Sequence, residues 1–145
     1  MLLEQVLYQA QVTATGGREG RAVSSDRVLE VELATPRALG GAGRRGTNPE
    51  QLFAAGYAAS FLSAMQYVAA RDTLRIPPEI WVESTVGVGT IPQGFGLEVE
   101  LRIALPGLSY REAEALLYKA HGVCPYSNAT RDNIAVRLVL VSSHA

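Results

Sequence analysis

The chain has 145 residues, of which 48% are hydrophobic and 19% are charged, and its formal net charge is −1. This composition is typical of a single globular domain with a substantial core, and it excludes a disordered chain. The near-neutral charge also excludes a broad basic surface for nucleic acid.

The sequence shows no signal of secretion. Its first residues lack a basic segment followed by a long apolar core, so no signal peptide is expected. The longest nearly apolar run, Leu52 to Met65, is shorter than the roughly 20 residues that span a bilayer. Cys124 is the one cysteine, so no internal disulfide can form, and a cytoplasmic location is expected. The sequence has no metal-ligand motif and predicts neither a metal nor a bound cofactor.

The first third of the chain predicts two strands. Val6 to Thr15 has strand composition and leads into a Gly-rich loop at residues 16–20. Val28 to Leu33 alternates loosely and indicates a second strand. A Gly-rich connector at residues 40–46 follows.

The strongest helix signal comes next. Asn48 is a suitable N-cap and Pro49 suits the first helical position, while Thr47 and Glu50 fit a capping box. The pattern predicts a helix that runs to about Arg71. Because this helix is apolar nearly all round, it is expected to be central and covered on several sides.

The second half predicts a hairpin, a helix and a strand. Ile80 to Thr90 and Phe95 to Leu105 are expected to pair through a turn at residues 92–94. Ser109, with Glu112 three residues later, predicts a capped helix that ends near Val123. Ile134 to Val141 is expected to form the last strand. The chain therefore predicts an α+β fold in one domain, residues 1–145.

Two segments carry a family resemblance. The segments Thr47–Phe61 and Ala120–Thr130, together with the Gly-rich loop around Arg18, resemble the signature segments of the organic hydroperoxide resistance proteins (Ohr), within the wider OsmC-like group. The resemblance implies the OsmC-like fold, with antiparallel sheets around a central buried helix, in an intertwined homodimer. It also implies a thiol peroxidase that reduces organic and fatty-acid hydroperoxides, regenerated by a dithiol such as lipoamide on a lipoylated protein.

The resemblance assigns four site positions. Ser60 stands where the family has its peroxidatic cysteine, and Cys124 matches the resolving cysteine. Arg18 matches the arginine beside the peroxidatic thiolate, and Glu50 matches the carboxylate that holds this arginine. Three of the four residues agree with the family, and the departure is at the nucleophile.

The implied chemistry explains these residue types. A thiolate attacks one peroxide oxygen and becomes a sulfenic acid, which a second thiol converts to a disulfide. A neighbouring guanidinium raises the thiolate fraction at neutral pH, and a carboxylate fixes the orientation of that guanidinium. Serine cannot replace the thiolate, because its hydroxyl stays protonated and forms no disulfide. We therefore expect little or no peroxidase activity from the chain with Ser60.

Two origins of the serine are open. An engineered Cys→Ser variant is favoured, because the surrounding site residues are intact, and the alternative is a natural member that lost the activity. Glu50 and Ser60 are ten residues apart on one helix, about 15 Å along its axis. Because one guanidinium would struggle to reach both on the same chain, we expect Arg18 and Glu50 of one subunit to act on position 60 of the other.

Each site residue also has an ordinary explanation. Glu50 suits a helix start, Arg18 suits a solvated loop, and Cys124 suits an inert buried thiol. Ser60 suits a packed hydroxyl in an apolar helix. The agreement of all four positions with one family's site favours the functional interpretation.

Two rival functions are considered. A serine hydrolase would use Ser60 with His121 or His144 as base, but no G-x-S-x-G segment surrounds the serine. His121 most simply complements a helix C-terminus, and no catalytic role is assigned to it.

The second rival is a non-catalytic binder of acyl or peroxide ligands. Apolar side chains near the site would favour alkyl ligands over hydrogen peroxide. The candidates are Phe53, Tyr57, Phe61 and Tyr126.

Overall fold

The computed structural model describes residues 1–141, which fall into two compact units, one of residues 1–49 and a second that begins at Glu50. The first unit holds an antiparallel sheet in the order β1-β2-β3. Its elements are β1 (Val12–Thr15), the 3₁₀ turn η1 (Gly17–Glu19), β2 (Arg21–Ser24), β3 (Glu30–Glu32) and the 3₁₀ turn η2 (Arg37–Leu39).

Both strands predicted in this unit are shorter than expected. The first begins at Val12 rather than Val6, because its partner β2 offers only four residues and ends at Ser24. The second predicted strand corresponds to β3, which begins at Glu30 rather than Val28 because a tight turn precedes it. In this turn the Val28 N–H donates to Asp26 Oδ1 at 3.0 Å. Strand β2 was not predicted from the sequence.

The second unit contains a three-stranded sheet in the order β4-β5-β6. Strands β4 (Trp81–Ile91) and β5 (Gly94–Ala104) form the predicted hairpin, with Ile91 opposite Gly94 across the turn. Strand β6 (Val136–Val141) starts two residues later than expected and pairs parallel to β5. This sheet is therefore mixed, which corrects the expectation of antiparallel sheets. The parallel pair follows from the helical crossover between β5 and β6.

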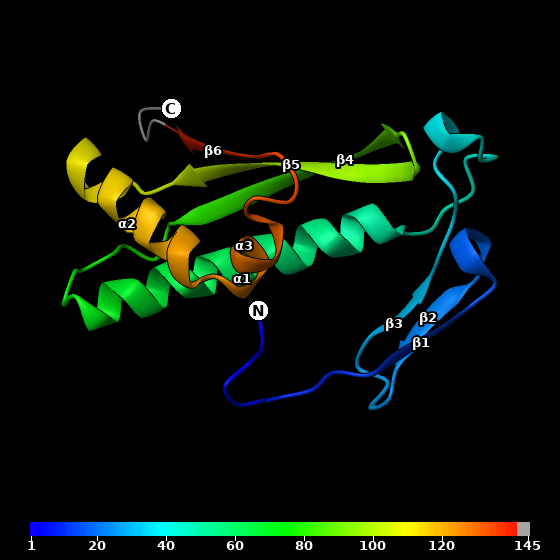
Figure 1. Cartoon of the computed structure of the whole chain (residues 1–145), viewed down its shortest axis with the longest axis horizontal. Coiled ribbons are helices and arrows are strands. Elements are labelled where there is room, and N and C mark those ends of the chain that lie inside the picture. The colour runs from blue at the N-terminus through cyan, green and yellow to red at the C-terminus, as the bar shows by residue number, and fades with distance from the viewer. Residues whose placement is uncertain (142–145) are drawn as a thin grey trace. The chain divides into compact units, whose positions relative to one another are not determined.

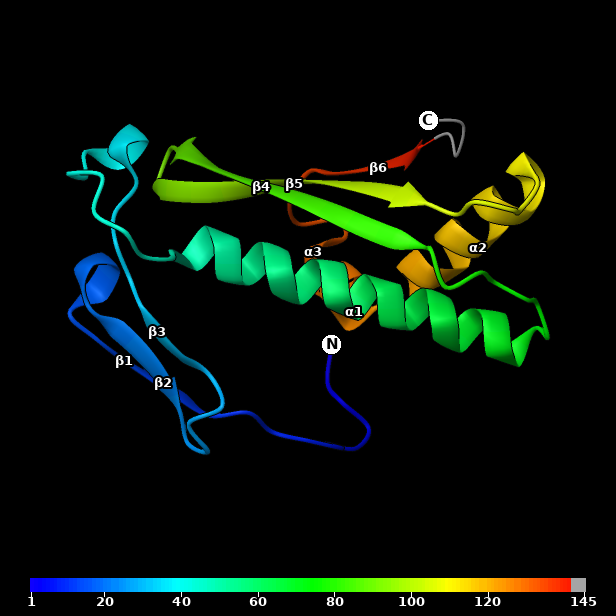
Figure 2. The same ribbon diagram turned by 180° about the vertical axis from the view of Figure 1, so that it is seen from behind.

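Three helices lie on one face of this sheet (Figures 1 and 2). They are α1 (Pro49–Arg71), α2 (Tyr110–Val123) and α3 (Pro125–Thr130). The bounds of α1 confirm the prediction, with Pro49 as its first residue. Ser109 caps α2 with the predicted capping box, since its Oγ accepts from the Glu112 N–H and the Glu112 carboxylate accepts from the Ser109 N–H. The short helix α3 is not predicted from the sequence.

The core of this unit lies between the sheet and the helices. Alternate residues of β5 (Val99, Leu101 and Ile103) point inward and are buried, whereas Glu98, Glu100 and Arg102 alternate with them, as the sequence predicts. The helices contribute buried side chains that include Phe61, Met65, Val68, Leu116 and Leu117. The α+β class is therefore confirmed.

Helix α1 supplies one face to this core and exposes another. Tyr57, Phe61 and Met65 are fully buried, whereas Ala59 and Tyr67 are exposed. An 18-residue window of α1 has a mean hydropathy of 1.2, which would suffice for a membrane span by length and composition. The buried face accounts for the apolar sequence by core packing instead.

Candidate functional site

The structure brings together Ser60 and Cys124, which are 64 residues apart in the sequence. Ser60 lies in the middle of α1 and is half-buried, and Cys124 is completely buried. The distance from Ser60 Oγ to Cys124 Sγ is 3.7 Å, within hydrogen-bonding range for sulfur. The two positions that the resemblance pairs are therefore in direct contact.

Cys124 is fixed at the junction of two helices. Its N–H donates to the Ala120 carbonyl at 2.8 Å and ends α2, while its carbonyl accepts from the Asn128 N–H at 2.9 Å and begins α3. Pro125 then occupies the first position of α3, where its missing N–H costs nothing. The thiol position is therefore set by both helices.

Aromatic rings surround the turn of α1 that precedes Ser60. The ring of Tyr126 lies 5.9 Å from that of Phe53 and 5.5 Å from that of Tyr57. The Tyr126 hydroxyl lies over Gly56, so close that a Cβ at Gly56 would be 2.5 Å from it. The Cα–Cβ bonds of an α-helix tilt toward its N-terminus, so Ser60 follows directly on the turn of α1 that carries Gly56.

Of the apolar side chains expected near the site, Phe53 and Tyr126 are half-buried. Phe61 and Tyr57 are completely buried. Both rings therefore belong to the core rather than to an accessible wall.

A buried network of hydroxyl groups lies next to the pair. The Tyr57 hydroxyl lies 2.9 Å from Ser127 Oγ and 3.1 Å from Thr130 Oγ1. Ser127 Oγ also lies 2.8 Å from His121 Nδ1. These contacts satisfy the polar groups of α1 and α3 that folding removes from water.

His121 lies in the last turn of α2, where the sequence places it at a helix C-terminus. Burial, and secondarily the positive charge of Arg131, lower the pKa of His121 below its usual value. Its Nδ1 lies 2.8 Å from Ser127 Oγ, whereas the side-chain partner of Ser60 Oγ is Cys124 Sγ. His144, the other candidate base, lies outside the described residues.

Arg18 and Glu50 lie in different units. Arg18 is the central residue of η1, and Glu50 lies in the first turn of α1, where a carboxylate is favourable to the helix dipole. Both residues make interactions of their own. Their assignment to the site stays a prediction.

The loop that carries Arg18 is held by its neighbour Glu19. The Thr35 N–H donates to Glu19 Oε2 at 2.6 Å, and Arg44 contacts Glu19 Oε1 at 3.3 Å and the Leu33 carbonyl at 2.6 Å. The hydrogen bonds from Thr35, followed by that from Arg44, lower the pKa of Glu19 to about 2. Gly16, with φ of 75°, supplies the left-handed conformation that starts the loop.

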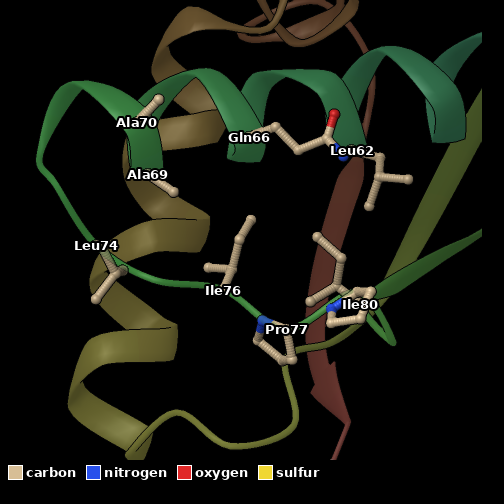
Figure 3. A pocket seen from close by; sticks show the side chains of 9 residues that line it. Leu62, Gln66, Ala69, Ala70, Leu74, Ile76, Pro77 and Ile80 are labelled. Atoms are coloured by element: carbon tan, nitrogen blue, oxygen red, sulfur yellow. The ribbon is translucent and has the colours of Figure 1, made fainter.

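An apolar groove of about 530 Å³ lies further along α1. Figure 3 shows Leu62 of α1 together with Ile76 and Ile80 of the segment that leads into β4. The Gln66 amide also lines the groove. The groove is separate from the Ser60–Cys124 contact, although Leu62 lies only two residues beyond Ser60.

Within residues 1–141 no group of three or more metal-binding side chains occurs. What the sequence missed is the hydroxyl network of Tyr57, Ser127 and Thr130. One signal was available, because a tyrosine in an apolar helix needs a partner for its hydroxyl when buried.

Comparisons with known proteins identify the family to which this α+β chain belongs. Residues 40–139 match the family model described as OsmC-like protein. The chain is 65% identical over 137 residues to the organic hydroperoxide resistance protein of Xanthomonas axonopodis pv. citri (strain 306), which covers 94% of this chain and 96% of that protein. It is 49% identical over 139 residues to the organic hydroperoxide resistance protein OhrA of Bacillus subtilis (strain 168), with 94% and 97% covered.

A solved structure agrees. The organic hydroperoxide resistance protein OsmC from Legionella pneumophila superposes with a TM-score of 0.90 at 46% identity, covering 95% of this chain and all of that one. The chain therefore belongs to the OsmC/Ohr family.

Proposed function

We propose that the chain is the scaffold of a thiol-dependent peroxidase that reduces organic and fatty-acid hydroperoxides to alcohols in defence against oxidative stress, silenced by serine at the peroxidatic position. The names of its relatives support a role in resistance to organic hydroperoxides. The observation that carries the proposal is the 3.7 Å contact between Ser60 and Cys124. Disulfide chemistry needs two sulfur positions that can approach each other in this way.

The proposed reaction proceeds in two steps when a thiol occupies position 60. The thiolate takes the distal oxygen of the hydroperoxide, so that sulfur is oxidised to a sulfenic acid and the alkoxide leaves as the alcohol with one proton. The Cys124 thiol then attacks this sulfur and releases water, which leaves a disulfide. The Ser60 hydroxyl supports neither step.

The remaining parts of the proposal come from the family resemblance. Arg18 would stabilise the thiolate and the departing alkoxide, and Glu50 would orient its guanidinium. A dithiol such as lipoamide on a lipoylated protein would reduce the disulfide in the cytoplasm.

A homodimer completes the proposal. It is supported by the exposed face of α1, which carries Ala55, Ala59 and Tyr67. Ser63 and Gln66 are also exposed on α1, and a face that mixes small, aromatic and uncharged polar residues in this way can be covered by a second subunit without burying a charge.

The test is Ser60→Cys, with Ser60→Ala as the matched control. Consumption of cumene hydroperoxide with dihydrolipoamide is measured for all three proteins. Loss of a catalytic nucleophile costs roughly 10⁴- to 10⁶-fold in turnover, so Ser60→Cys is expected to exceed the Ser60 chain by at least about 1,000-fold. Ser60→Ala should match the Ser60 chain. An inactive Ser60→Cys protein that is folded would refute the proposal.

A second function, binding of acyl ligands without reaction, is favoured by the apolar groove in Figure 3. Alkyl chains gain free energy when they leave water for such a surface. Ile76→Gln should then weaken the binding of a fluorescent fatty acid to the Ser60 chain. Unchanged binding would remove the groove as the ligand site.

A further inference from the structure

The hydroxyl network bridges three helices beside the Ser60–Cys124 contact. Tyr57 belongs to α1, Ser127 and Thr130 belong to α3, and His121 belongs to α2. The distances between the bonded atoms are 2.8 to 3.1 Å. Tyr57 and Ser127 are completely buried.

The hydroxyl network and the Ser60–Cys124 contact link the same two segments of the chain. Tyr57 lies three residues before Ser60, on the same side of α1, and Ser127 lies three residues after Cys124. The bond from Tyr57 to Ser127 therefore joins the same two segments as the contact from Ser60 to Cys124, about one helical turn away. His121 lies three residues before Cys124, so its bond to Ser127 brackets the cysteine between two bonded residues.

Cys124 itself sits where one helix ends and the next begins. Such a junction can change its angle more easily than the interior of a helix, since its backbone leaves helical geometry (ψ of 125° at Cys124). The bond from His121 to Ser127 links α2 to α3 across this junction through buried Ser127. A second bond, from the exposed Arg131 guanidinium to the His121 carbonyl at 3.0 Å, links the end of α3 to α2.

We propose that Tyr57, Ser127 and His121 are positioning residues that hold the thiol of Cys124 against position 60 of α1, and so set the effective concentration of the two thiols when position 60 carries one. The inference rests on the proposed function for its biological meaning. Its physical content, the proximity of positions 60 and 124, does not depend on peroxide.

The consequence for the reaction is a competition at the sulfenic acid. Attack by the Cys124 thiol forms the disulfide and releases water. Attack by a second hydroperoxide adds another oxygen to the same sulfur, yields a sulfinic acid and releases a second alcohol. A network that holds the Cys124 thiol close favours the first route over the second.

Tyr57→Phe is a clean probe because it leaves no hydroxyl in the network without a partner. Ser127 keeps its contact with His121, and Thr130 keeps its bond to the Ser127 carbonyl at 3.3 Å. The phenyl ring keeps its place between Phe53 and Tyr126. The fold is therefore expected to survive. Tyr118→Phe is the matched control, since it removes a hydroxyl from an exposed tyrosine on α2.

The experiment measures the disulfide between positions 60 and 124 in S60C, S60C/Y57F and S60C/Y118F. Each protein is equilibrated in a redox buffer of reduced and oxidised dithiothreitol, and the disulfide fraction is measured after acid quenching and thiol alkylation. Loss of the network bond is expected to lower the effective concentration of the thiols about fivefold in S60C/Y57F. S60C/Y118F should equal S60C.

An effective concentration in S60C/Y57F equal to that in S60C would overturn the proposal. A purely structural role would lower the melting temperature of S60C/Y57F without changing the effective concentration, and this result would also overturn it. Because no peroxide is present, an inactive S60C protein would refute the proposed function and leave this measurement intact.

A second arm uses cumene hydroperoxide and mass spectrometry. S60C/Y57F should accumulate more sulfinic acid than S60C for each equivalent of peroxide consumed. An unchanged sulfinic acid yield would contradict the positioning role.

Discussion

Ser60 Oγ lies 3.7 Å from Cys124 Sγ, although 64 residues separate the two positions in the chain. The contact joins the middle of α1 to the junction of α2 and α3. It therefore closes a long loop through the core of the second unit, and a covalent bond here would constrain the unfolded chain strongly.

This geometry predicts a stabilising disulfide in Ser60→Cys. A bond that closes a loop of this length is expected to raise the free energy of unfolding by roughly 4 kcal/mol, because it removes conformations from the unfolded state. Urea unfolding of the oxidised and dithiothreitol-reduced variant checks the value. The Ser60 chain, measured with and without dithiothreitol, is the control and should show no difference. An oxidised variant no more stable than the reduced one would contradict the geometry.

The close approach of Tyr126 to Gly56 predicts an unusual effect of Gly56→Ala. Alanine in place of glycine within a helix normally stabilises by about 0.5–1 kcal/mol. Here the new Cβ would be 2.5 Å from the Tyr126 hydroxyl, and overpacking costs about 1–3 kcal/mol. The clash should dominate, so we expect a net loss of about 1 kcal/mol in thermal or urea unfolding.

Gly122 in α2 provides the matched control, since a Cβ at that position meets nothing within 4 Å. Gly122→Ala should stabilise the protein. In addition, Tyr126→Phe should recover part of the loss in the Gly56→Ala background, because it removes the nearest atom. Equal effects of alanine at the two glycines would show that Tyr126 is not held over α1.

The pKa of His121 predicts a pH-dependent stability. Burial keeps its folded pKa below the usual 6.5, so the unfolded chain binds a proton at a higher pH than the folded chain. The stabilising contribution is therefore complete above about pH 6.5 and is lost as the pH falls from there toward the folded pKa. Urea unfolding between pH 7.5 and 5 should show the decline, and His121→Gln should remove it.

His144→Gln is the control for this titration, because it removes the other histidine of the chain. It should leave the decline in place. A decline of equal size in His121→Gln would mean that other groups cause it.

Sequence signals within one helical turn predicted where the helices begin, but no such signal predicted how distant strands pair. Pro49 and the capping box at Ser109 marked the starts of α1 and α2, because capping depends on residues within one turn. The parallel pairing of β5 with β6 joins segments some 37 residues apart, and no local pattern encodes it. Helix α3 has only six residues, too few to show helical periodicity.

The site divides in the same way. Ser60 and Cys124 were paired by resemblance; the structure shows that they lie 3.7 Å apart, and their chemical roles stay predictions. The bonds of Tyr57 to Ser127 and of His121 to Ser127 depend on how three helices pack, so the sequence could indicate only that a buried tyrosine needs a partner.

The hydrogen bonds of Glu19 predict that its carboxylate, in the loop that carries Arg18, titrates at an unusually low pH. The pKa of Glu19 is lowered from 4.5 to about 2, chiefly by Thr35 and then by Arg44. The contribution of this carboxylate to loop structure is therefore present above about pH 4.5 and is lost only as the pH falls through about 2. The Thr35 amide donates to Glu19 at 2.6 Å, so its NMR chemical shift should follow this titration.

Two variants separate the causes of this low pKa. Arg44→Gln should raise the pKa of Glu19 only in part, because the hydrogen bonds from Thr35 remain and are the larger cause. Glu19→Gln should abolish the titration of the Thr35 amide. A midpoint near 4.5 in the unmodified chain would mean that Glu19 does not hold this loop. In that case the position of Arg18 would depend on other contacts, and Glu19→Gln in the Ser60→Cys background should leave peroxide consumption unchanged.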